Sequence, residues 1–62
     1  MQAGDLVGYV KDPALYGPLT VVEITFRGWV VCEDKDGVVA GKFQPHELDD
    51  AKRFWTAAGA SA

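Results

Sequence analysis

The stretch "WVVCEDKDGVVAGKFQPHEL", residues 29–48, holds two apolar segments joined by a tight turn and followed by a proline-containing bend. The segments 29–34 and 38–43 are rich in β-branched residues, which favour strands. Between them, the Asp-Gly pair at 36–37 supplies the positive φ that short hairpin loops need. We therefore predict an antiparallel hairpin, with a bulge or bend where Gly41 interrupts its second strand.

Two further strands are predicted before this hairpin, over residues 4–11 and 19–26, with a tight reversal at Arg27-Gly28. Residues 11–18 contain two prolines and a glycine, which indicates a loop. The segment 49–58 has two interpretations. Apolar residues at helical spacing predict a short helix, whereas an extended chain would add a fifth strand.

The segment "FQPHEL", residues 43–48, is predicted to close the sheet. Phe43 and Leu48 point inward in this interpretation, and Pro45 fixes the turn between them. His46 is then a solvated turn residue. The alternative is that His46 acts as a general base or a metal ligand, which for a metal requires at least two further convergent ligands.

Composition limits the function classes. The 62 residues carry six basic and nine acidic side chains, a net charge of −3, which argues against a duplex-binding protein. The single cysteine, Cys32, excludes an internal disulfide and a zinc site of several thiolates, and we expect a buried, inert thiol. With neither a basic-then-apolar leader nor a long apolar run, we expect a soluble cytoplasmic protein without membrane contact.

Two acidic stretches have simple explanations. "DKDG", residues 34–37, superficially matches a calcium loop, but that register places Phe43 where an acidic ligand is required. The acidic residues around 33–36 and 47–50 are interpreted as solvated rims, with a surface for a basic protein as the alternative. We expect no metal and no cofactor.

The pattern resembles the SH3-like small β-barrels. The resemblance is carried by a Gly-Asp-x-Val opening, a Gly-Trp entry to the third strand, an Asp-Gly hairpin and an aromatic-x-Pro-x-x-apolar closure: Gly4, Asp5, Val7, Gly28, Trp29, Asp36, Gly37, Phe43, Pro45 and Leu48. It implies an all-β fold, a small SH3-like antiparallel barrel of about five strands with a 3₁₀ turn and a short C-terminal helix or extended tail. Residues 1–62 would form one domain, with the barrel over 4–50 and a C-terminal segment over 49–62.

Three relatives within this group give different expectations. Trp29 and Pro45 match the tryptophan and proline of the groove in peptide-binding SH3 domains, whereas Leu48 stands where the groove has a tyrosine. Plasmid-encoded type II dihydrofolate reductases use a Val-Gln-Ile-Tyr strand, for which residues 40–43 here read Ala-Gly-Lys-Phe. Short uncharacterised bacterial and phage proteins share the pattern of "GDLV", "TVVEI" and "FQPHEL" best.

The aromatic residues suggest the function. Tyr9, Phe26 and Phe43 are predicted to lie in the barrel interior. Tyr16, Trp29 and Trp55 are predicted to be partly exposed. Aromatic and arginine side chains are favoured at protein interfaces. The leading hypothesis is a non-enzymatic interaction module of bacterial, phage or mobile-element origin. It would bind a protein partner or its own copies through Tyr16, Arg27, Trp29, Phe54 and Trp55.

Several alternatives stay open. Trp55 is either an interface residue or a cover over the open end of the barrel. A nucleic-acid-binding barrel remains the second function, if Lys11, Arg27, Lys35 and Lys42 gather on one face. A third is an oligomeric enzyme of the type II dihydrofolate reductase kind, with a pore lined by the 38–43 strand of several copies.

Overall fold

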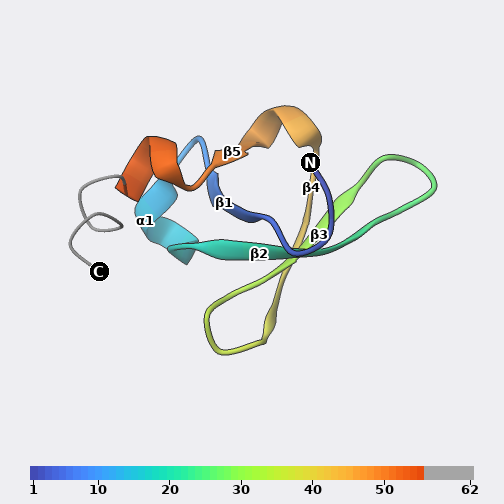
Figure 1. Ribbon diagram of the computed structural model, residues 1–62, viewed down its shortest axis with the longest axis horizontal. Coiled ribbons are helices and arrows are strands. Elements are labelled where there is room, and N and C mark those ends of the chain that lie inside the picture. Colours follow the sequence, from blue (N-terminus) through green and yellow to red (C-terminus); the bar gives the residue numbers. More distant parts are fainter. Residues whose placement is uncertain (56–62) are drawn as a thin grey trace.

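The computed structural model describes residues 1–55, which form five short strands and three short helical segments (Figure 1). The strands are β1 (Leu6–Tyr9), β2 (Leu19–Ile24), β3 (Val30–Glu33), β4 (Val39–Phe43) and β5 (Leu48–Asp50). A one-turn helix, α1 (Pro13–Tyr16), follows β1, and a 3₁₀ turn, η1 (Pro45–Glu47), precedes β5. Residues 52–55 are helical. The all-β prediction with about five strands and a 3₁₀ turn is confirmed.

The five strands form one antiparallel sheet in the order β4-β3-β2-β1-β5. Two irregularities interrupt the pairing: Val22 is the extra residue on β2, and Ala40 is the extra residue on β4. The second lies beside Gly41, where the sequence predicts a bulge or bend. Bulges bend a strand and increase its twist, which lets this small sheet coil around its own core.

One hydrophobic core lies inside the coiled sheet. Its buried side chains come from all five strands and the residue after β5: Val7, Leu19, Val21, Val30, Cys32, Phe43, Leu48 and Ala51. No polar or charged residue among 1–55 is buried. The inward positions predicted for Phe43 and Leu48 are confirmed. Between them, η1 carries His46 on the exposed side of the turn.

A cluster of three aromatic rings packs beside this core. The ring centroids of Tyr9, Tyr16 and Phe43 are all 5.5 Å apart, in tilted or edge-on pairs. Edge-to-face arrangements of this kind are the favoured geometry for aromatic pairs. Helix α1, which lies within the predicted loop 11–18, brings Tyr16 back onto the sheet.

The interior position predicted for Phe26 is wrong. Phe26 exposes 105% of its reference surface. β2 ends at Ile24, and the chain reverses in the turn that the Gly28 N–H to Thr25 carbonyl hydrogen bond closes. Phe26 therefore lies in the turn after the strand.

The C-terminal segment combines its two interpretations. β5 pairs with β1, and residues 52–55 then turn into a helix. The rings of Phe54 and Trp55 pack over Gly8, where an added Cβ would lie 2.5 Å from Phe54 Cδ2 and 2.8 Å from Trp55 Cζ3. The rest of the predicted 49–58 segment lies outside the described residues.

Candidate functional site

The hairpin between β2 and β3 ends in a turn that is closed by the backbone and by a threonine. The Gly28 N–H donates to the Thr25 carbonyl at 2.9 Å, and the Thr25 N–H donates to the Trp29 carbonyl at 2.8 Å. The Trp29 N–H donates to Thr25 Oγ1 at 3.0 Å. Gly28 adopts φ +88°, which glycine tolerates best. This is a type I turn followed by a left-handed glycine, a common hairpin loop.

The hairpin between β3 and β4 repeats this geometry. The Gly37 N–H donates to the Asp34 carbonyl at 3.0 Å, and the Asp34 N–H donates to the Val38 carbonyl at 2.9 Å. Asp34 Oδ1 accepts hydrogen bonds from the N–H groups of Asp36 at 2.9 Å and Val38 at 3.0 Å. Gly37 has φ +78°. The predicted Asp-Gly hairpin is therefore confirmed, and the two turns have matching backbone hydrogen bonds.

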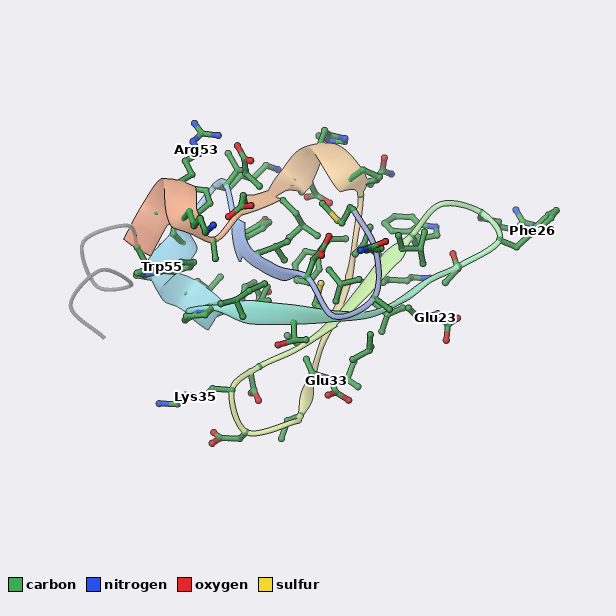
Figure 2. All side chains as sticks on the ribbon, viewed as in Figure 1. Glu23, Phe26, Glu33, Lys35, Arg53 and Trp55 are labelled. Atoms are coloured by element: carbon green, nitrogen blue, oxygen red, sulfur yellow. The ribbon has the colours of Figure 1, made fainter. Side chains whose placement is uncertain are left out.

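The two turns differ in their two outermost residues. The β3–β4 turn presents Lys35 and Asp36 to solvent, whereas the β2–β3 turn presents Phe26 and Arg27. Figure 2 shows Phe26 at the far end of its hairpin, pointing away from the body of the protein. Because the same turn forms with a lysine and an aspartate, the fold does not require an aromatic ring here. We call Phe26 and Arg27 the hairpin tip.

The base of the hairpin tip is less exposed than the tip itself. The half-buried ring of Trp29 lies under the ammonium group of Lys42, with Nζ 5.1 Å from the ring centroid. That distance is within the range of a cation–π contact. Ile24, which pairs with Val30 across the sheet, keeps 43% of its surface exposed. The residues next to the hairpin tip are therefore a half-buried tryptophan in contact with a lysine and a partly exposed isoleucine.

The five residues predicted to bind a partner lie in separate places. Arg27 and Trp29 belong to the β2–β3 hairpin, and Tyr16 belongs to the aromatic cluster with Tyr9 and Phe43. Phe54 and Trp55 pack over Gly8, and Trp55 lies at the opposite end of the molecule from Phe26 (Figure 2). Sequence reasoning missed Phe26. The available signal was that "TFRG" and "DKDG" occupy matching turn positions.

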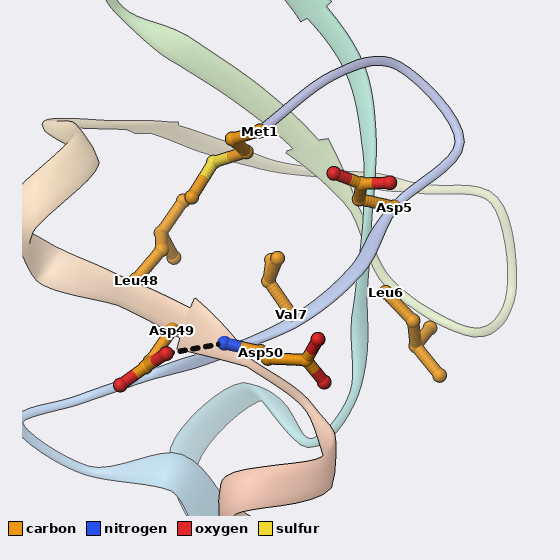
Figure 3. A pocket seen from close by; sticks show the side chains of 7 residues that line it. All are labelled: Met1, Asp5, Leu6, Val7, Leu48, Asp49 and Asp50. Carbon is orange, nitrogen blue, oxygen red and sulfur yellow. Dashed lines mark hydrogen bonds between the residues drawn. The ribbon is translucent and has the colours of Figure 1, made fainter.

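A pocket of about 290 Å³ lies between the N-terminal segment, β1 and β5 (Figure 3). Apolar side chains and three carboxylates line it: Met1, Leu6, Val7, Leu48, Asp5, Asp49 and Asp50. We call it the β1–β5 pocket. Each of its carboxylates accepts a hydrogen bond from a nearby backbone N–H, which holds its orientation.

One of these carboxylates also forms an ion pair. Arg53 Nη1 donates to Asp49 Oδ2 at 2.7 Å, from a position four residues later in the chain. This hydrogen bond, together with that from the Asp50 N–H, lowers the pKa of the Asp49 carboxyl. Asp49 is therefore anionic throughout the neutral range.

Three further observations concern the chemistry of the described residues. Cys32 is fully buried, and burial raises the pKa of its thiol to about 11, so the reactive thiolate is suppressed at neutral pH. Within residues 1–55, no group of three or more potential metal ligands gathers around one point. None of the helices described there is both long enough and apolar enough to cross a bilayer.

The basic residues named for the nucleic-acid alternative are spread over different elements. Lys35 lies on the tip of the β3–β4 hairpin, well separated in Figure 2 from Phe26 and the β2–β3 tip that carries Arg27. Lys42 lies on β4, and its ammonium group is over the ring of Trp29. Comparisons of this chain with protein-family models, with curated proteins and with solved structures gave no match.

Proposed function

We propose that this protein is a non-enzymatic interaction module that binds another protein chain through the hairpin tip. One observation carries the proposal: Phe26 is fully exposed on a turn whose equivalent in the same molecule is built from Lys35 and Asp36. An aromatic ring in water contributes nothing to the core. Its presence is explained if the ring is buried on binding.

The chemistry of the hairpin tip fits this role. Phenylalanine is enriched at the cores of protein interfaces, and arginine is among the side chains most enriched in the few that dominate binding energy. Phe26 and Arg27 are adjacent, and Thr25 and Gly28 hold the turn that carries them. A preformed turn limits the conformational entropy that binding would otherwise remove.

The architecture is consistent with an SH3-like barrel of the kind expected in short bacterial and phage proteins. The coiled five-strand sheet and the 3₁₀ turn before β5 support that assignment. The fold alone carries no function, since small barrels serve many unrelated roles. The proposal therefore depends on the hairpin tip and not on the fold.

Site-specific photo-cross-linking tests this proposal. A photoreactive phenylalanine analogue replaces Phe26 in one variant and Lys35 in a second, and both are irradiated in the cells that naturally produce the protein. The two positions share the same turn geometry and differ only in the proposed contact. We expect discrete cross-linked protein products from position 26 and none from position 35. Equal cross-linking from both positions, or none from position 26, would overturn the proposal.

A further inference from the structure

The molecule contains a pocket whose size and lining suit the hairpin tip. The β1–β5 pocket is about 290 Å³, and Met1 and Leu6 supply its exposed apolar surface, whereas Val7 and Leu48 are buried. We propose that the hairpin tip of one copy docks in the β1–β5 pocket of a second copy of this chain. This inference rests on the proposed function and names the partner for that same surface.

The volume is sufficient for the ring of Phe26. An apolar cavity of about 150 Å³ in another protein holds a benzene molecule. The β1–β5 pocket is larger than that, and it opens to solvent beside the exposed side chains of Met1 and Leu6. A phenylalanine ring can therefore enter it without displacing the buried residues Val7 and Leu48.

The charges are complementary as well. Asp5 and Asp50 place two carboxylates at the pocket, whereas Asp49 is already paired with Arg53, and Arg27 follows Phe26 directly at the tip. Arg27 is the only charged residue in the turn 25–29. The β3–β4 turn carries Asp34 and Asp36 beside Lys35, so its net charge is negative, as is that of the pocket. Charge thus favours one turn over the other, although both have the same shape.

The two surfaces lie on different parts of the molecule. Phe26 is fully exposed at the end of its own hairpin, so it does not fill the pocket of its own chain. Each contact joins a tip to a pocket. Two copies can therefore pair reciprocally as a two-fold dimer, or successive copies can form a ring or an open chain.

Sedimentation velocity on the purified protein tests the inference. The concentration is varied from about 10 µM to about 1 mM, because a contact this small buries less area than a stable interface needs. We expect the mean sedimentation coefficient to rise with concentration. The double substitution Phe26→Lys with Arg27→Asp copies the β3–β4 turn, and it should weaken association at least about tenfold.

Leu6→Lys is the matching change on the pocket side. Leu6 is 52% exposed, so a lysine is tolerated there, and its ammonium group would repel Arg27 and occupy the carboxylates. Val39→Lys is the control, because Val39 is similarly exposed at 58% but belongs to neither surface. We expect Leu6→Lys to weaken association at least about tenfold and Val39→Lys to change it less than about twofold.

Mixing the tip variant with Leu6→Lys tests whether the tip of one copy enters the pocket of another. The tip variant keeps its pocket, and Leu6→Lys keeps its tip, so an equimolar mixture should form dimers that grow no further. A wild type that stays monomeric up to about 1 mM, or a mixture of variants that stays monomeric, would overturn the inference. In either case, a cross-link from position 26 to a different protein would leave the proposed function standing. If position 26 also gives no cross-linked product, both the inference and the proposed function are wrong.

Discussion

Thr25 and Asp34 occupy equivalent positions in two hairpins of the same geometry. Each backbone carbonyl accepts the N–H of a left-handed glycine three residues later, at 2.9 Å and 3.0 Å. Each side-chain oxygen accepts the N–H of the residue four positions on, in both cases at 3.0 Å. The same turn therefore forms with an exposed aromatic ring at Phe26 and without one at Lys35, so the β3–β4 turn serves as a control for the β2–β3 turn.

Removing the hydroxyl of Thr25 should loosen the hairpin tip. Thr25→Val keeps the shape but leaves the Trp29 N–H without its side-chain acceptor, and we expect a loss of about 0.5–1.5 kcal/mol in the free energy of unfolding. Hydrogen exchange at the Trp29 amide should accelerate. Thr20→Val, which lies in β2 and away from the turn, is the control. Equal exchange rates at Trp29 in both variants would contradict the role of Thr25.

A methyl group at Gly8 should disturb the C-terminal helical residues. The new Cβ would lie 2.5 Å from Phe54 Cδ2 and 2.8 Å from Trp55 Cζ3. We expect Gly8→Ala to lower the free energy of unfolding by about 1–3 kcal/mol, as overpacking usually does. Its Trp55 fluorescence, recorded in a Trp29→Phe background, should shift to the red.

Phe54→Ala gives the matched test of this contact. In the Phe54→Ala background, the added methyl group has more room, so Gly8→Ala should cost less than it does in the wild type. A cost that is the same in both backgrounds would show that the ring of Phe54 is not what the methyl group meets.

The buried thiol of Cys32 should make stability depend on alkaline pH. Burial raises the pKa of Cys32 from 9.0 to about 11, so the unfolded chain loses this proton first. The contribution is fully present below the unfolded pKa and is lost as pH rises through the folded pKa. Urea unfolding of wild type and Cys32→Ala should therefore show a difference that shrinks between about pH 9 and about pH 11. A difference independent of pH would contradict the assignment.

The sequence predicts the fold better than it predicts the site. Turn residues such as Gly37 and the pair Phe43 and Leu48 carry local signals, because backbone conformation and inward alternation depend on few neighbours. The interior position predicted for Phe26 assumes a strand over residues 19–26, whereas β2 ends at Ile24 and Phe26 lies in the turn. The point at which the strand ends is set by its pairing with β3, which a single strand does not reveal.

Among the predicted binding residues, Tyr16, Trp29 and Trp55 are expected to be partly exposed, and each is partly exposed while also packing against a ring, a cation or a close backbone. How much of an aromatic side chain is exposed depends on long-range packing. The matching positions of "TFRG" and "DKDG" are visible in the sequence, whereas the shared hydrogen bonds of the two turns are seen only in the structure.

The free energy of unfolding of the variant Phe26→Lys with Arg27→Asp tests the central claim most directly. Measured by urea denaturation at low protein concentration, it should lie within about 0.5 kcal/mol of the wild type, because both residues are exposed and the other turn already contains this pair. A loss of about 3–5 kcal/mol, the cost of truncating a buried phenylalanine, would contradict the account. It would show that Phe26 belongs to the fold and not to a binding surface.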